Sequence, residues 1–306
     1  MKGKILTELR SRKEIVSGEY LSSTLGISRV SVWKHIHKLQ ELGYNILATS
    51  NGYQLIDSPD TLYSWEFPGR EARIHYFPEL PSTMDTAKDL ARKNCPDFTV
   101  VIAGRQTEGR GRLSRQWLSE DGGLYFTLVL RPEIPVPISS RVNFLASLIL
   151  AQLLREMYQI EAAVKWPNDI LVENRKLSGM LSELEAEADR VFFINIGMGI
   201  NVNNDPAGIE AGAISLKKLL GREISRIRLL SRFLDKFENR LKNADFENVI
   251  LEWKQYTVTL QRPVRIVTQQ EVTEGLAVDV DENGALIIKL ADGSLKKIIY
   301  GDCFLV

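Results

Sequence analysis

The spacing of the apolar residues changes twice along this chain of 306 residues. In roughly the first 43 residues they recur every three or four positions, as on helices. From about residue 67 helical runs alternate with branched, strand-like runs, and from about residue 259 the pattern is almost entirely strand-like. Since single domains commonly hold about 100 to 200 residues, we expect several domains, with limits at 1–60, 67–258 and 259–306.

The first domain has the pattern of a winged helix. The run "SGEYLSSTLGISRVSVWKHIHKLQELGY" predicts two helices with Ser17 and Ser28 as their N-caps and Gly26 at the turn between them. The next run, "YNILATSNGYQLI", alternates as two strands do, and Asn51-Gly52 is a strong hairpin signal. Helix, turn, helix and hairpin in this order are the winged-helix arrangement. The segment "DSPDTLYSWE" that follows is predicted to be a linker.

Charge suggests a partner for this domain. Residues 1–56 contain eight basic and four acidic side chains, a net charge of +4, although the whole chain is formally neutral. This imbalance favours an anionic polymer such as DNA. The alternative is a small helical domain that binds protein and whose charges are simply solvated. The candidate DNA-binding residues on the polar face of the second helix are Ser28, Arg29, Ser31, Lys34, His37 and Lys38.

Composition excludes several classes of protein. No apolar run approaches the roughly 18 residues that span a bilayer, so we expect a cytoplasmic protein with no membrane contact. Cys95 and Cys303 are far apart and lack partners at metal spacing, which argues against a disulfide framework or a structural zinc site. His35 and His37 would point to different faces of a helix, so a histidine metal site is not expected.

The central domain contains a glycine-bearing basic run, "EGRGRLSRQW" (108–117), between the strand-like runs "TVVIAG" and "LYFTLVL". Glycine lets backbone N–H groups approach an anion, and arginine matches carboxylate or phosphate oxygens in bidentate geometry. The spacing fits neither a P-loop nor a dinucleotide-binding fingerprint. The run therefore predicts a loop for a small anionic ligand.

A second cluster, "KWPNDILVENRKLSGMLSEL", lies downstream of this loop. Lys176 and the arginines of the loop, if they meet in one cleft, would neutralise the charge that develops when a carboxylate attacks ATP. By spacing alone, each of these charges is equally compatible with an exposed side chain.

Several motifs in the same order resemble one family. "GRGRLSRQW", "KWPNDI", "RKLSGMLSEL" and "IGMGINVN" closely resemble the biotin-protein ligases. With the winged helix in front, the chain resembles the bifunctional form that is also the biotin operon repressor. The resemblance implies an α+β multidomain protein: a winged helix, a central mixed α/β catalytic domain with a large sheet, and a small SH3-like C-terminal β-barrel.

The resemblance also implies a reaction and its partners. Biotin and ATP with Mg²⁺ would give biotinyl-5′-AMP, which then acylates a lysine of a biotin carboxyl carrier protein. The adenylate would also favour a homodimer that binds operator DNA. Two other functions stay open: a biotin-sensing transcription regulator without catalysis, and a lipoate-type ligase. Intact Arg112 and Lys176 argue against the first, and "GRGRLSRQW" with the winged helix argues against the second.

Site residues follow from the resemblance. Arg112 and Lys176 would act on the adenylate, and Asp169 would orient Lys176 or contact Mg²⁺. Arg115, Trp117 and Asn201 would join Arg110 and Arg112 around the nucleotide, although Trp117, Asp169 and Asn201 are also compatible with core or turn positions. At position 84 the family usually has asparagine, so the role of Met84 stays open. The residues implied for biotin are Ser82, Thr83, Met84, Gln106, Arg110, Gly111, Arg112 and Lys176.

Overall fold

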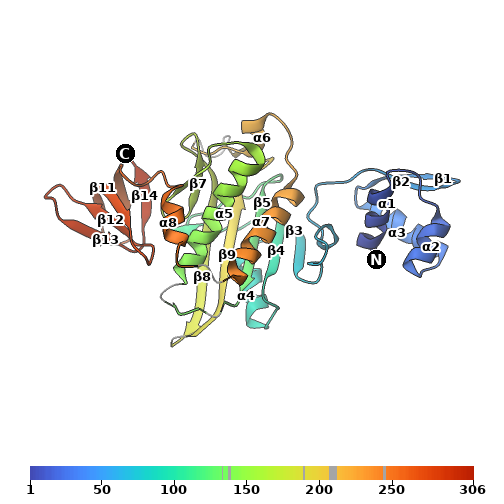
Figure 1. Ribbon diagram of the computed structural model, residues 1–306, viewed down its shortest axis with the longest axis horizontal. Helices are drawn as coiled ribbons and strands as arrows, with labels where there is room; N and C mark the ends of the chain where they lie inside the picture. Colours follow the sequence, from blue (N-terminus) through green and yellow to red (C-terminus); the bar gives the residue numbers. More distant parts are fainter. Residues whose placement is uncertain (133, 137–138, 189, 207–211, 244–245) are drawn as a thin grey trace. The chain divides into compact units, whose positions relative to one another are not determined.

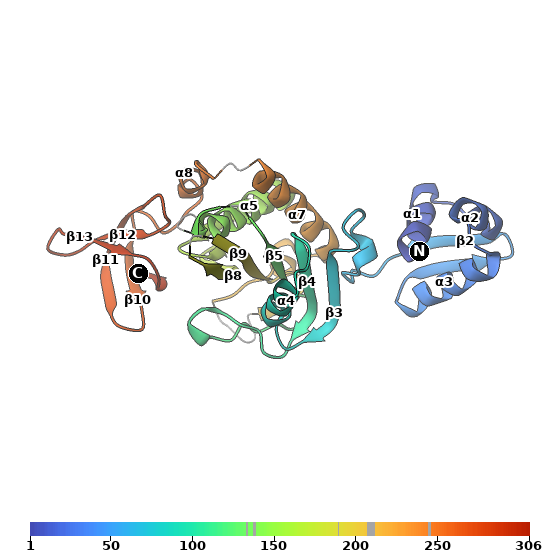
Figure 2. The same ribbon diagram turned by 90° about the horizontal axis from the view of Figure 1, so that it is seen from below.

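A computed structural model describes residues 1–132, 134–136, 139–188, 190–206, 212–243 and 246–306. The chain divides into two compact units, Met1–Ala72 and Arg73–Val306. Figures 1 and 2 show the two units from perpendicular directions. Each unit is described below by itself.

The N-terminal unit is a helix-turn-helix followed by a hairpin, as predicted. Ser17 and Ser28 accept hydrogen bonds from the backbone N–H groups of Tyr20 and Ser31, both at 3.1 Å, so both predicted N-caps are present. Val32, Ile36 and Leu39 are buried in the core of the unit. Its elements are α1 (Lys2–Arg12), α2 (Gly18–Leu25), α3 (Arg29–Glu41), β1 (Asn45–Thr49) and β2 (Gly52–Asp57).

The turn of the hairpin lies one residue earlier than predicted. Thr49 pairs with Gly52, so Ser50 and Asn51 form the turn and Gly52 opens β2. Gly52 has φ of 144°, and a Cβ at this position would lie 2.2 Å from the carbonyl oxygen of Val16. The glycine is therefore needed where the hairpin crosses the backbone before α2, rather than in the turn.

The segment predicted as a linker packs onto the N-terminal unit. Glu66 is buried and lies 2.9 Å from the guanidinium of Arg10, and it accepts a hydrogen bond from the hydroxyl of Tyr44. The indole of Trp65 donates to the same hydroxyl at 2.9 Å. The prediction of a linker was wrong here. Pro and Asp are typical of linkers, but the aromatic residues of this segment pack onto the unit. The segment contains the short helical turn η1 (Ser64–Glu66).

The second unit is built on a seven-stranded sheet in the order β3-β4-β5-β9-β8-β7-β6. Only β3 and β4 pair in parallel, and every other neighbouring pair is antiparallel. The strands are β3 (Ile74–Leu80), β4 (Thr99–Gln106), β5 (Leu124–Leu130), β6 (Ala163–Lys165), β7 (Asp169–Val172), β8 (Arg175–Glu187) and β9 (Arg190–Ile200).

Helices cover both faces of this sheet. Figure 2 shows α5 and α7 on one face and α4 on the other. The apolar side chains of α5 are buried almost continuously from Phe144 to Leu154, which explains why its run is so hydrophobic. None of the described helices is long and apolar enough to cross a membrane. The helices are α4 (Thr83–Arg92), α5 (Ser140–Tyr158), α6 (Leu216–Leu220), α7 (Arg226–Lys242) and α8 (Val249–Lys254), with a short turn η2 (Arg112–Ser114).

A five-stranded antiparallel sheet ends the chain, in the order β13-β12-β11-β10-β14. The predicted turns at Asn283-Gly284 and Asp292-Gly293 both lie between its strands, and each glycine has positive φ. The strands are β10 (Pro263–Val267), β11 (Val272–Val280), β12 (Leu286–Lys289), β13 (Leu295–Ile298) and β14 (Asp302–Leu305).

Gly52→Ala should destabilise the hairpin far more than Gly26→Ala. Gly26 also has positive φ, 64°, but no atom lies within 4 Å of an added Cβ, so its cost is about 1–2 kcal/mol of backbone strain. At Gly52 the added methyl also breaks the paired backbone bonds between Val16 and Tyr53, which raises the cost to about 3 kcal/mol. Amide hydrogen exchange of Tyr53 should then accelerate about a hundredfold. Equal effects of the two substitutions would contradict this account.

Candidate active site

One cavity of the second unit collects most of the predicted site residues. Its floor is the face of the large sheet at β8 and β9, and its other walls come from α4, the loop 107–118, the turn before β7 and the start of β14. The predicted residues that line it are Thr83, Met84, Gln106, Arg110, Gly111, Arg112, Arg115, Trp117, Asp169 and Lys176.

Glycines on two neighbouring strands let the indole of Trp117 lie directly against the sheet. Gly179 of β8 and Gly199 of β9 are partners in the strand register. A Cβ at Gly199 would lie 2.3 Å from the Trp117 ring, and one at Gly179 would lie 2.9 Å from it. The ammonium of Lys176 stands 5.2 Å from the centre of the same ring. Trp117 is therefore a wall of the cavity and not a remote core residue.

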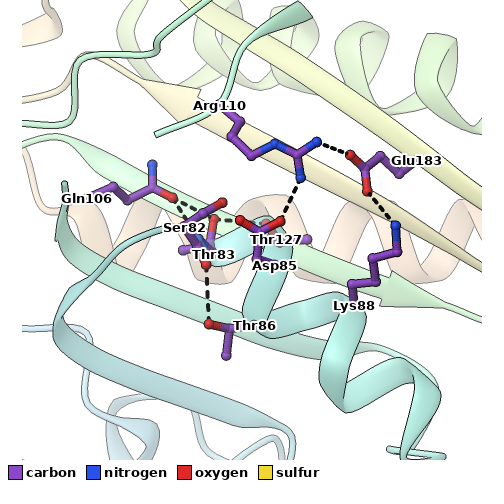
Figure 3. Close-up of polar contacts among 9 residues, drawn as sticks. All are labelled: Ser82, Thr83, Asp85, Thr86, Lys88, Gln106, Arg110, Thr127 and Glu183. Carbon is purple, nitrogen blue, oxygen red and sulfur yellow. Dashed lines mark hydrogen bonds and ion pairs between the residues drawn. The ribbon is translucent and has the colours of Figure 1, made fainter. Parts of the chain in front are cut away.

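The cavity wall at Thr83 and Gln106 consists of neutral polar groups. The side chain of Gln106 accepts hydrogen bonds from the backbone N–H of Thr83 at 2.8 Å and from its hydroxyl at 3.0 Å. Thr127 donates to the Thr83 hydroxyl at 2.9 Å, and Gln106 donates to Ser119 at 2.8 Å. Figure 3 shows the links among Gln106, Thr83 and Thr127. This network fixes donors and acceptors suited to an uncharged polar ring.

Ser82 and Met84 flank this network. Ser82 is buried, and its hydroxyl has no hydrogen-bond partner among the described residues. It does not line the cavity itself, whereas its neighbour Thr83 does. Met84 packs its sulfur against Gly197, where an added Cβ would lie 2.6 Å from it. Met84 thus gives this end of the cavity an apolar surface.

The opposite end of the cavity is cationic. Asp169 lies between two lysines, with Lys176 3.0 Å from one carboxylate oxygen and Lys165 3.2 Å from the other. Arg112 donates to the side-chain oxygen of Asn168 at 3.2 Å, and Arg115 pairs with Asp302 at 2.5 Å. Four cations thus meet two carboxylates here, and the excess positive charge suits a ligand with a carboxylate or phosphate.

Arg112 is half-buried. It also donates to the carbonyl oxygen of Gly301 at 3.0 Å, so it connects the loop to the C-terminal sheet region. Burial lowers the pKa of Arg112, while Asp302 and Asp169 act against that shift. The two carboxylates therefore favour the charged guanidinium, which burial disfavours.

Arg110 differs from the other cations. Its guanidinium pairs with Asp85 and Glu183, each at 2.6 Å, and Glu183 also lies 3.7 Å from Lys88 (Figure 3). Arg110 lines the cavity, but its charge is already opposed by two carboxylates.

Asn201 lies outside this cavity, in a neighbouring pocket on another side of Trp117. Its side chain accepts a hydrogen bond from Asn204 at 3.0 Å, and it is buried. Trp117 lines both spaces and separates them.

Several residues in the cavity wall were not predicted from the sequence. Lys165 stands four positions before Asp169 in "KWPND", and this single acid-base spacing was the available signal. Asp302, Cys303 and Phe304 line the cavity from the C-terminal region, and no local motif announced them. The fold of the chain brings these residues to the site from a distant part of the sequence.

The described residues do not form a cluster of three or more His, Cys, Asp or Glu that could hold a metal. Both oxygens of Asp169, the predicted magnesium contact, face lysines. The protein side chains at this site therefore do not fit a magnesium ion held by the protein alone.

In the N-terminal unit, the predicted DNA-binding residues lie at the N-cap of α3 and along this helix. Ser28, Arg29, Lys34, His37 and Lys38 are exposed, and Ser31, whose N–H donates to the N-cap, is half-buried. The ring of His37 lies 4.3 Å from that of Trp33, which is exposed on the same helix.

Comparison with known proteins identifies the family. The chain is 37% identical to the bifunctional ligase/repressor BirA of Bacillus subtilis, over 98% of this chain and 97% of that protein. The chain belongs to the biotin protein ligase family. The Escherichia coli BirA is 28% identical over 97% of this chain and 95% of that protein.

Family models and solved structures agree with this membership. Residues 76–201 match the biotin/lipoate A/B protein ligase family, 2–54 match an HTH domain and 259–306 match the biotin protein ligase C-terminal domain. A solved biotin protein ligase from Aquifex aeolicus, in complex with biotin and ATP, matches with a TM-score of 0.64 and 29% identity over 76% of this chain and 98% of that chain. The predicted family, fold class, ligase activity and attached repressor function are confirmed.

Cys303 should resist alkylation despite its place in the cavity wall. Burial raises the pKa of its thiol to about 11, and only the thiolate is nucleophilic. At pH 8 about one molecule in a thousand carries the thiolate, and the rate should rise about tenfold per pH unit up to about pH 11. Peptide mapping after iodoacetamide treatment should find the half-buried Cys95 modified first. Alkylation of Cys303 at pH 8 as fast as in the unfolded chain would contradict this.

Proposed function

We propose that the protein activates biotin with ATP to biotinyl-5′-AMP, transfers biotin to a lysine of a biotin carboxyl carrier domain, and represses transcription by binding operator DNA. The main support is the cavity, which joins a neutral polar end at Thr83 and Gln106 to a cationic end at Arg112, Lys165 and Lys176. Biotin has a matching charge distribution, with an uncharged ureido ring at one end and a carboxylate at the other.

In the first step a carboxylate oxygen of biotin attacks the α-phosphorus of ATP, and the bond to pyrophosphate breaks. Lys176 and Arg112 would stabilise the negative charge on the carboxylate and phosphate. Asp169 would orient Lys176, since their side chains lie 3.0 Å apart. Lys165 would add a second cation from the other side of Asp169.

In the second step the amine of the acceptor lysine attacks the acyl carbon of the adenylate. The bond to the phosphate oxygen breaks, AMP leaves and the amine loses a proton. The nucleophile comes from another protein, so the site needs no nucleophile of its own. Cys303 suits that view because its thiol, with a pKa raised to about 11, is protonated at neutral pH. Catalysis would rest on positioning and charge stabilisation.

We assign the biotin ring to Thr83, Gln106 and Met84, with Ser82 supporting them and Gly111 beside the ligand. Arg115, Trp117 and Asn201 are assigned to the nucleotide, with adenine next to the Trp117 ring. Mg²⁺ would arrive bound to the phosphates of ATP, since the carboxylate of Asp169 is engaged with lysines. Residues 1–60 would be the winged-helix DNA-binding domain, 67–258 the ligase catalytic domain and 259–306 the SH3-like C-terminal domain. The adenylate-bound protein would act on DNA as a homodimer.

Incubation with biotin, MgATP and an apo carrier domain should biotinylate the acceptor, and an excess of lipoate should not compete. Lys176→Ala should slow ATP–pyrophosphate exchange about 10² to 10³-fold, because it removes one cation from the developing charge. Arg112→Gly should chiefly speed release of the adenylate. Lys236→Ala, which removes a surface lysine paired with Glu156, is the matched control and should keep full activity. Absence of acceptor biotinylation would refute the enzyme assignment.

Lys34→Ala should weaken binding to a DNA duplex selected from a random library. If Lys34 contacts a phosphate, the slope of log K against log salt should fall by about one unit. Lys4→Ala removes an exposed lysine from α1 and should leave the slope unchanged. Biotin plus ATP should strengthen binding in the wild-type protein. DNA affinity that survives deletion of residues 1–60 would contradict the repressor half of the proposal.

A further inference from the structure

Arg110 stands apart from the cations that surround Asp169. Arg112 and Lys176 lie near Asn168 and Asp169, at the end of the cavity suited to an anion. Arg110 instead reaches Asp85 on α4 and Glu183 on β8 (Figure 3). A guanidinium already opposed by two carboxylates is a poor partner for a third anion. Its place in the basic run therefore needs another explanation.

The position of Arg110 in the loop suggests that explanation. Backbone bonds from Thr107 and Glu108 to Leu80 and Pro81, at 3.0 and 2.9 Å, hold only the start of loop 107–118. Further along, Arg112 and Arg115 connect it to Gly301 and Asp302. In the part of the chain that the structure describes, the ion pairs that join this loop to α4 and β8 are those of Arg110. Arg110 thus ties one side of the loop to two walls of the cavity.

We propose that Arg110 is a positioning residue that latches loop 107–118 across α4 and β8 and so sets how long biotin and its adenylate remain in the cavity. The identity of the ligand rests on the proposed function. The latch itself consists of Asp85, Arg110 and Glu183.

The exposure of the latch predicts how it responds to salt. The side chains of Arg110, Asp85 and Glu183 are 42%, 58% and 24% exposed. Burial acts to lower the pKa of Arg110, but Glu183 and Asp85 raise it above the ordinary value, which agrees with a firmly paired cation. Ion pairs this exposed are weakened by screening, since the Debye length falls from about 10 Å at 0.1 M salt to about 3 Å at 1 M.

Carboxylate variants separate a latch from a ligand contact. If Arg110 latches the loop, Arg110→Gln, Asp85→Asn and Glu183→Gln should each speed biotin dissociation up to about fivefold. In the Arg110→Gln/Glu183→Gln double variant, the change in the free energy of dissociation should be smaller than the sum of the two single changes. If Arg110 contacts the ligand, Asp85→Asn and Glu183→Gln would free it, and dissociation would stay the same or slow. That second result would overturn the proposal.

Glu185→Gln is the matched control. Glu185 pairs with Arg92 at 2.9 Å and so also joins β8 to α4, but without touching the loop. Its dissociation rate should equal that of the wild type. Raising salt from about 0.1 M to about 1 M should speed dissociation in the wild type and Glu185→Gln, and should change Arg110→Gln much less. Equal salt responses in all three would count against the latch.

Trypsin provides a readout that needs no ligand. The loop offers cleavage sites at Arg110, Arg112 and Arg115, and cleavage requires local opening of the loop. Asp85→Asn and Glu183→Gln should increase the cleavage rate of the ligand-free protein severalfold relative to Glu185→Gln, as followed by mass spectrometry. Unchanged cleavage would refute the latch even if biotin binds. Failure of biotin to bind at all would refute the proposed function, and the cleavage rate would still decide whether the latch exists.

Discussion

The site depends on the close approach of one loop to the bare face of two strands. Gly179 and Gly199 are register partners on β8 and β9, and together they leave a strip of sheet without side chains. The Trp117 indole fills that strip, and Met84 occupies the next position at Gly197. Any larger residue at these glycines would push the loop away from the sheet. The absence of side chains at these glycines therefore shapes the cavity as much as the side chains that line it.

A second constraint is the repulsion among like charges gathered in one place. Lys165, Lys176, Arg112 and Arg115 lie around the same cavity, and Asp169 and Asp302 are placed among them. Each carboxylate offsets part of the repulsion while the cluster keeps an excess of positive charge. A cavity of this kind tolerates its own cations and still favours an anion.

Sequence alone predicted the elements whose signals are local. The helix caps at Ser17 and Ser28 depend on residues a few positions apart, and these predictions were confirmed. Strand β8 was not recognised as one long strand because its outer half, "ELEAE", is rich in acidic residues and only partly buried. Likewise Asp302 and Phe304 gain their places from packing between segments far apart in the chain, which no single stretch of sequence reveals.

The two arginines that reach the C-terminal region have a thermodynamic consequence. Arg112 donates to the carbonyl of Gly301, and Arg115 pairs with Asp302, so the closed loop and the docked C-terminal strands share these bonds. Linkage makes such coupling reciprocal. If closing the loop through these bonds adds to the binding free energy of a ligand, then the bound ligand stabilises the attachment of the C-terminal strands by the same amount. A ligand in the cavity therefore stabilises the C-terminal strands, although these strands carry no chemistry motif of their own.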